Sequence, residues 1–171
     1  MISEKLQLVL PSLPDSIHEV ERFVEDICEE YNINNTYFGN ILVAVTEAFE
    51  NAVKHGNNND PSRNVTIDFT SKPEGLSFAI SDEGIGFNIN DVPDPTDINI
   101  EVEKIKGRGI FLIKALADEV KFPKNGTEVE ILFKISSINS VLAIDRINQL
   151  KEFSSQKEKA PSQNFSNNSA K

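Results

Sequence analysis

The chain has 171 residues, a formal net charge of −10 and a single cysteine, Cys28. This length suits one domain with a substantial core, the acidic excess disfavours direct binding to nucleic acid, and one cysteine excludes an intramolecular disulfide. No stretch of the sequence approaches the roughly 20 apolar residues of a membrane span, so we expect a cytoplasmic protein with no membrane partner.

The N-terminal part of the sequence predicts a strand followed by a helix. Residues 6–10 form a short apolar run that closes at Pro11, which is typical of a strand before a turn. From Ile17 to Ile27, apolar residues recur at helical spacing. Asp15 or Ser16 is suited to cap this helix.

The longest helical pattern covers residues 37–55. Its apolar stripe leaves Glu47 and Asn51 on a polar side, which we expect Ala44 to share, and it leaves His55 near the margin. Glu47 and Asn51 are one helical turn apart, so their side chains are neighbours on the helix surface. A carboxylate and an amide in this arrangement can orient a nucleophile and hold a metal ion.

A hairpin and a glycine cluster follow this helix. Residues 64–70 and 76–81 alternate between apolar and polar side chains on either side of a turn, which predicts two paired strands. The cluster Asp82-Glu83-Gly84-Ile85-Gly86 comes directly after the second strand. Residues 88–106 contain prolines and acids without sustained periodicity, and we interpret them as a loop or lid.

The remaining sequence predicts one more helix and one more strand before a C-terminal extension. Gly107-Arg108-Gly109 opens a helix that we expect to continue to Val120, and residues 128–135 form the last predicted strand. We therefore assign residues 1–136 to one domain. Residues 137–171 form an extension in which a short helix precedes a polar tail that cannot bury enough surface to fold.

Two common phosphate-binding motifs are absent from this sequence. There is no Walker lysine motif, and Gly84-Ile85-Gly86 does not continue to the third glycine of a dinucleotide-binding fingerprint. Instead, the helix with Glu47, Asn51 and His55 is followed in order by the cluster at Asp82, by Gly107-Arg108-Gly109 and by Gly126-Thr127. Glycines let backbone amides approach an anion closely, and those at the start of a helix lie at the positive end of its dipole.

This order of elements resembles the GHKL ATPase superfamily, and within it the small anti-sigma factor serine kinases of the RsbW and SpoIIAB kind. The resemblance covers about residues 3–135. It implies an α/β two-layer sandwich with a mixed, largely antiparallel sheet and with helices packed on one face. It also implies that the protein binds ATP with Mg²⁺.

The resemblance assigns a role to each element. Glu47 matches the general base, Asn51 the magnesium ligand, and Asp82 the carboxylate that reads adenine. A carboxylate only accepts hydrogen bonds, so Asp82 suits the exocyclic amine of adenine and leaves the carbonyl of guanine unmatched. The other expected contacts to ATP are Gly84, Gly86, Lys106, Gly107, Arg108, Gly109 and Thr127.

The implied function is that of an ATP-dependent serine protein kinase that is also an anti-sigma factor. Such a protein phosphorylates an anti-anti-sigma partner of the STAS type and alternately holds that partner or an RNA polymerase sigma factor. The resemblance also implies a homodimer. Two alternatives stay open, namely a nucleotide-gated adaptor with little transfer activity and a detached ATPase domain of a two-component system.

Overall fold

The structure, a computed structural model, describes residues 5–92 and 107–135. The contacts between Cα atoms divide the chain after Lys134, and the fold below belongs to the first unit, Met1–Lys134. The predicted phosphate contact Lys106, most of the predicted lid and the predicted C-terminal helix lie outside the described residues.

In this part of the chain, five strands form one sheet with the order β1-β2-β3-β5-β4. Every pairing between these strands is antiparallel. Ile67 lies opposite Ile80, and Ile80 lies opposite Val129, so apolar rows run across the sheet. The strands are β1 (Lys5–Pro11), β2 (Asn64–Lys72), β3 (Gly75–Ser81), β4 (Glu119–Lys121) and β5 (Glu128–Phe133).

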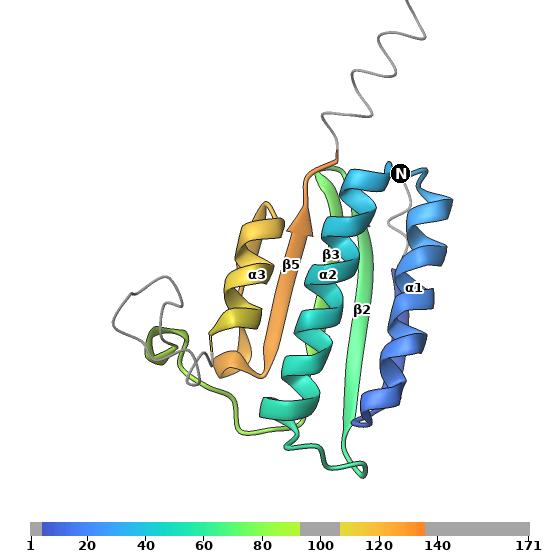
Figure 1. Cartoon of the computed structure of the whole chain (residues 1–171). Helices are drawn as coiled ribbons and strands as arrows, with labels where there is room; N and C mark the ends of the chain where they lie inside the picture. The colour runs from blue at the N-terminus through green and yellow to red at the C-terminus, as the bar shows by residue number, and fades with distance from the viewer. Residues whose placement is uncertain (1–4, 93–106, 136–171) are drawn as a thin grey trace, which may run out of the picture. The chain divides into compact units, whose positions relative to one another are not determined.

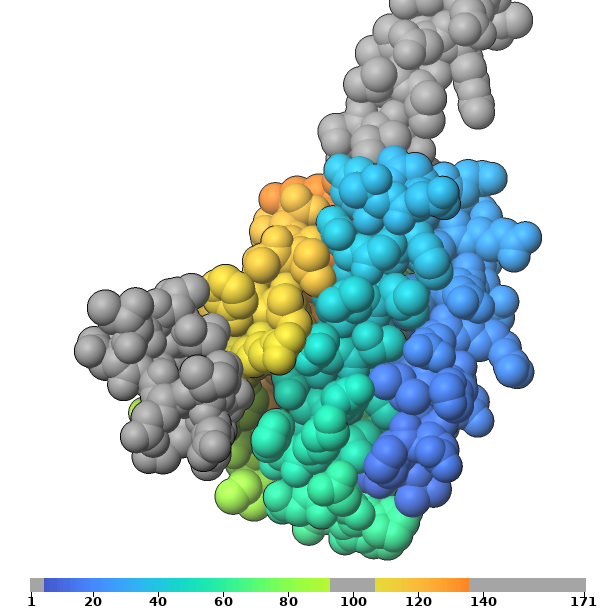
Figure 2. All heavy atoms as spheres, viewed as in Figure 1, coloured from blue at the N-terminus to red at the C-terminus, as the bar shows by residue number. Residues whose placement is uncertain are grey.

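Among the described residues, three α-helices cover one face of this sheet, as Figure 1 shows: α1 (Ile17–Glu30), α2 (Asn35–Asn51) and α3 (Arg108–Leu116). In Figure 2 their atoms hide most of the strands behind them, with α2 between α1 and α3. The predicted two-layer sandwich with helices on one face is therefore confirmed. Shorter helical turns lie at Pro14–Ser16, Ala52–Gly56, Ile89–Asp91 and Lys124–Gly126, and the turn at Ala52–Gly56 is a π-helix.

The core lies between the helices and the sheet. The alternation in β2 and β3 points Phe69 and Phe78 to the helices, where their ring centroids are 5.2 Å apart, and Phe133 of β5 continues this row at 6.4 Å from Phe78. All three phenylalanines are buried. None of the helices in the described residues is long and apolar enough to cross a bilayer.

The prediction that Ala44 lies on a polar side of its helix is wrong, because Ala44 is fully buried. The central helix α2 packs against α1 on one side and α3 on the other. A helix with two helical neighbours and a sheet beneath it buries more than one apolar stripe.

The prediction that the last helix continues to Val120 is also wrong. The helix ends at Leu116, and Ala117 already has an extended backbone. The N–H of Asp118 donates to the carbonyl of Leu132 at 3.0 Å, and Val120 then pairs opposite Ile131 in the short strand β4. Val120 fits the helical pattern in the sequence, but in the structure it belongs to the edge strand β4.

Candidate functional site

A cavity of about 380 Å³ opens between the helices and one end of the sheet. Its walls include Asn51 from the end of α2, Asp82 and Gly86 from the segment after β3, and Gly126 and Thr127 before β5. Three of the four motifs that the sequence singles out therefore contribute directly to this cavity. The helix opened by the fourth motif, α3, contributes two apolar side chains, Ile110 and Ile113.

Asp82 is held in the wall of this cavity by its backbone and by its side chain. Its N–H donates to the carbonyl of Thr127 at 2.9 Å, and the N–H of Gly84 donates to its Oδ1 at 2.8 Å. A Cβ built on Gly56 would lie 2.3 Å from the Asp82 Cγ. The carboxyl group therefore fits against Gly56 only because that residue has no side chain.

The environment of Asp82 also changes its acidity. Burial raises the pKa of the Asp82 carboxyl, and it outweighs the opposing effects of the Gly84 hydrogen bond and the Arg63 charge. The ionised form of this carboxyl is thus under-solvated. An amine donor from a ligand would supply a hydrogen bond that water only partly provides here.

Two glycines allow the loops on the far side of the cavity to touch through their backbones. Gly86 has a φ of +78°, and a Cβ on it would lie 2.1 Å from the carbonyl oxygen of Asn125. Gly126 has a φ of +80°, and a Cβ on it would lie 2.4 Å from the carbonyl oxygen of Phe87. The N–H of Phe87 donates to the Asn125 carbonyl at 2.9 Å, so side chains at these glycines would separate the two loops.

The start of α3 lies against the polar pair of α2. A Cβ on Gly109 would lie 2.8 Å from Asn51 Nδ2 and 3.0 Å from Glu47 Oε2. Glu47 does not itself line the cavity, but it shares this contact with Asn51, which does. Gly107, which is buried at the N-cap of α3, and the exposed Arg108 do not line the cavity either.

A single amide is compatible with a magnesium site. Among the described residues no cluster of three or more His, Cys, Asp or Glu side chains could hold a metal ion. Magnesium usually keeps several waters and takes only one or two protein ligands together with phosphate oxygens. Asn51, half-exposed in the cavity wall, fits that kind of site.

Several lining residues were not predicted as part of a site. Phe87 and Phe122 make an edge contact with ring centroids 5.8 Å apart, and Lys114 Nζ lies 5.7 Å from the Phe122 centroid. In the sequence these aromatic residues are indistinguishable from core residues. The other unpredicted apolar walls are Ile80, Val92 and Val129, beside Ile110 and Ile113 of α3. The exposed His55, which the sequence pattern leaves near the margin of the apolar stripe, also lines the cavity.

A second carboxylate in the wall, Glu128, is paired within the protein. Lys124 Nζ lies 2.6 Å and Ser81 Oγ 2.7 Å from Glu128 Oε2. Burial alone would raise the pKa of Glu128, but these hydrogen bonds and the Lys124 charge together hold it below its ordinary value. Of the two half-buried carboxylates Asp82 and Glu128, Asp82 is therefore the one suited to receive a ligand donor.

A comparison of the sequence with known protein families agrees with the arrangement of this cavity. The family of histidine kinase-like ATPase domains matches residues 10–133. The chain belongs to this family. The predicted resemblance to GHKL ATPases is thereby confirmed, and the relatives described next confirm the resemblance to the RsbW kind.

Relatives of this domain include two proteins named serine-protein kinase RsbW. The one from Listeria monocytogenes serovar 1/2a is 27% identical over 123 residues, which are 69% of this chain and 78% of the relative. The one from Oceanobacillus iheyensis is 27% identical over 121 residues, which are 68% of this chain and 77% of the relative. A protein named anti-sigma F factor, from the same organism, is 28% identical over 105 residues, covering 59% of this chain and 72% of the relative.

A solved structure shows the same fold. The crystal structure of the RsbU and RsbW domains of a Mycobacterium tuberculosis protein superposes with a TM-score of 0.55 at 14% sequence identity. The match covers 77% of this chain and 32% of that longer chain. At this identity the likeness concerns the fold alone.

Proposed function

We propose that this protein is an ATP-dependent serine protein kinase that also acts as an anti-sigma factor. The observation that carries the proposal is that Asp82, with its under-solvated carboxyl, and Asn51 line one cavity, while Gly109 packs against both Asn51 and Glu47. The proposed base-reading carboxyl and the proposed magnesium ligand thus line one cavity, and the proposed base Glu47 lies next to that ligand. The names of the RsbW relatives support a kinase.

In this proposal each side chain has one task. Asp82 accepts a hydrogen bond from the exocyclic amine of adenine, and Thr127, just before β5, supports the base. Asn51 supplies one oxygen ligand to magnesium, which neutralises phosphate charge when it is bound. Glu47 accepts the proton of the attacking serine hydroxyl as the phosphoryl group is transferred. Arg108 and the backbone amides at Gly107 and Gly109, at the positive end of α3, would contact the phosphates where the triphosphate extends beyond the cavity walls.

The proposed protein substrate is a STAS-type anti-anti-sigma factor, and the proposed alternative partner is an RNA polymerase sigma factor. This pairing rests on the family and on the relative named anti-sigma F factor. We further propose that residues 1–136 form the kinase domain, that residues 137–171 are an extension, and that the protein works in the cytoplasm.

A homodimer is part of the same proposal. β1 is the outermost strand at one edge of the described sheet, and Leu6, Val9 and Leu13 on or just after it are exposed. A surface of this kind, together with the exposed side of α1, suits pairing with a second copy. Sedimentation measurements on the full chain would test this proposal, and a monomer at micromolar concentration would contradict it.

Phosphotransfer from labelled ATP tests the kinase assignment. The full chain is incubated with Mg²⁺, ATP labelled at the γ-phosphate and a STAS partner encoded near its gene, and phosphoserine on the partner is the expected product. Partner binding without phosphoserine would favour a nucleotide-gated adaptor. An acid-labile label on a partner histidine would instead favour an ATPase domain of a two-component system.

A further inference from the structure

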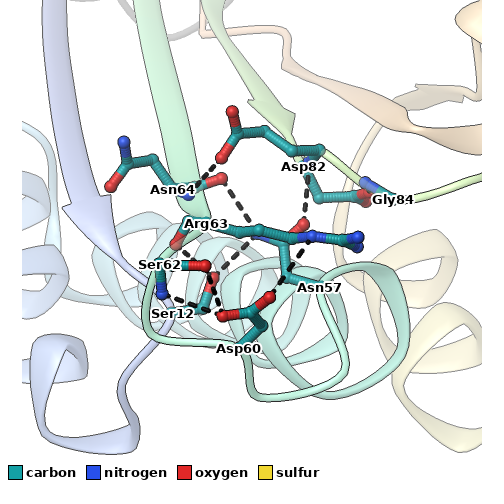
Figure 3. Close-up of polar contacts among 9 residues, drawn as sticks. Ser12, Asn57, Asp60, Ser62, Arg63, Asn64, Asp82 and Gly84 are labelled. Carbon is teal, nitrogen blue, oxygen red and sulfur yellow. Dashed lines mark hydrogen bonds and ion pairs between the residues drawn. The ribbon is translucent and has the colours of Figure 1, made fainter.

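A fully buried asparagine, Asn57, follows the π-helical turn at the end of α2. A buried amide is costly unless its donors and acceptor are paired. Figure 3 shows that the side chain of Asn57 lies among polar groups from separate segments of the chain.

The contacts of the Asn57 amide use both its ends. Its Nδ2 donates to Ser12 Oγ at 2.7 Å and to the carbonyl of Asn64 at 2.9 Å. Its Oδ1 accepts from the N–H of Glu83 at 2.8 Å. The orientation of the amide is fixed by these partners, because a flipped group would place its NH₂ against the N–H of Glu83.

These partners lie at the ends of three neighbouring strands. Ser12 follows β1, Asn64 begins β2 and Glu83 follows β3. Ser12 Oγ donates in turn to the carbonyl of Arg63 at 2.9 Å, and the Glu83 carboxylate accepts from the N–H of Asn64. Asn57 therefore ties the segment after β3 to the frame made by β1 and β2.

The segment that Asn57 holds contains Asp82. The peptide before Asp82 is fixed by the hydrogen bond from the Asp82 N–H to Thr127, and the peptide after it by the hydrogen bond from the Glu83 N–H to Asn57. Gly56, the residue before Asn57, makes room for the Asp82 carboxyl. Two adjacent residues thus set the backbone and the side chain of Asp82.

We propose that Asn57 is a positioning residue that aims the Asp82 carboxylate at the exocyclic amine of adenine. The inference rests on the proposed adenine site. It adds a residue that touches no ligand and acts only through the Glu83 peptide. Loss of its acceptor oxygen should therefore weaken recognition of the amine specifically, and not binding of the triphosphate in general.

A pair of nucleotides can isolate the proposed contact between Asp82 and the exocyclic amine. ATP and purine riboside triphosphate differ by the exocyclic amine, so the ratio of their dissociation constants reports the contact with Asp82. A hydrogen bond to a charged group changes affinity by a factor of roughly ten or more. We expect a ratio of that size for the wild-type full chain, measured by calorimetry with Mg²⁺.

Two variants of Asn57 separate its acceptor from its donors. Asn57→Ser keeps a hydroxyl donor, but its side chain is too short to reach the Glu83 N–H. For this variant we expect the ratio of the two dissociation constants to fall towards one. Asn57→Asp keeps an oxygen facing Glu83 and loses the donors, so we expect it to unfold at lower temperature but to retain most of the ratio. Val24→Ala, in the buried face of α1, is the control for destabilisation without contact to the site.

The outcomes separate this inference from the proposed function. A wild-type ratio near one, or no binding of ATP, would overturn the adenine site and this inference with it. A wild-type ratio of tenfold that persists in Asn57→Ser, or that falls equally in Val24→Ala, would overturn the role of Asn57 alone. Faster amide hydrogen exchange at Glu83 in Asn57→Ser, without nucleotide, is the expected independent sign of the lost contact.

Discussion

The two ends of the cavity differ in how their side chains are held. At the end that contains Asp82, the N–H groups of Asp82, Glu83 and Gly84 all donate to fixed partners at 2.8 to 2.9 Å. At the end that contains Asn51, with Glu47 beside it, a Cβ on Gly109 of α3 would lie 2.8 Å from Asn51 Nδ2 and 3.0 Å from Glu47 Oε2. The backbone around the proposed base reader is thus fixed by hydrogen bonds, whereas the proposed catalytic pair packs closely against the start of α3.

Removing the charge of Glu47 should break the catalytic end and leave the other end intact. Glu47→Gln keeps the shape of the side chain but cannot accept the serine proton, so we expect transfer to fall by about 10²- to 10⁴-fold. Calorimetry should show unchanged affinity for ATP. An unchanged transfer rate to the STAS partner would show that Glu47 is not the base.

A methyl group at Gly109 should disturb the same end through its geometry. The added Cβ would lie 2.8 Å from Asn51 Nδ2 and 3.0 Å from Glu47 Oε2, so both side chains must move. Misplacement of catalytic groups by about 1 Å can cost about 10²-fold in rate, and we expect Gly109→Ala to lower the transfer rate at saturating ATP accordingly. A wild-type rate at saturation would contradict the close contact.

A methyl group at Gly56 should disturb the opposite end. Its Cβ would lie 2.3 Å from the Asp82 Cγ, which forces the carboxylate out of its place. We expect Gly56→Ala to weaken ATP binding about tenfold, with a smaller change in the rate at saturation. Gly39→Ala, in α2, is the matched control because nothing lies within 4 Å of its added Cβ. Equal affinity in the two alanine variants would argue against Asp82 as the base reader.

The smallest expected effect concerns stability. Because burial raises the pKa of Asp82 above its ordinary value of 3.8, the folded protein without nucleotide is destabilised by ionisation of this carboxyl. Asp82→Asn removes that cost while its amide oxygen can still accept from Gly84. We expect the melting temperature of Asp82→Asn to equal that of the wild type below pH 3.8. The variant should melt at an increasingly higher temperature than the wild type as the pH rises through the raised pKa. A constant difference across this range would contradict the raised pKa.

The sequence carries enough information for most of the fold, because periodicity reports which side of an element is apolar. It does not report how many neighbours that element has, and Ala44 is buried for that reason. Val120 could not be assigned correctly either, since a strand of three residues is too short for a period of two to be distinguished from a helical one.

The residues of the candidate site also divide into those that the sequence predicts and those that it does not. Glu47, Asn51, Asp82 and Thr127 are predictable because their order along the chain forms a family pattern, although their roles stay predictions. Asn57 is not, because it stands in a run of three asparagines after Gly56 that is equally typical of an ordinary turn. Its burial depends on strand ends that are distant in sequence.

The π-helical turn at Ala52–Gly56 matters for any attempt to transfer the proposed nucleotide site into a designed scaffold. Here the N–H of Asn57 donates to the carbonyl of Ala52, five residues earlier, at 2.8 Å. Shortening the loop of chain by one residue to restore a regular helical end would rotate everything after it by about 100°. The glycine and the asparagine would then face away from the aspartate, so the irregular helix end has to be copied along with the side chains.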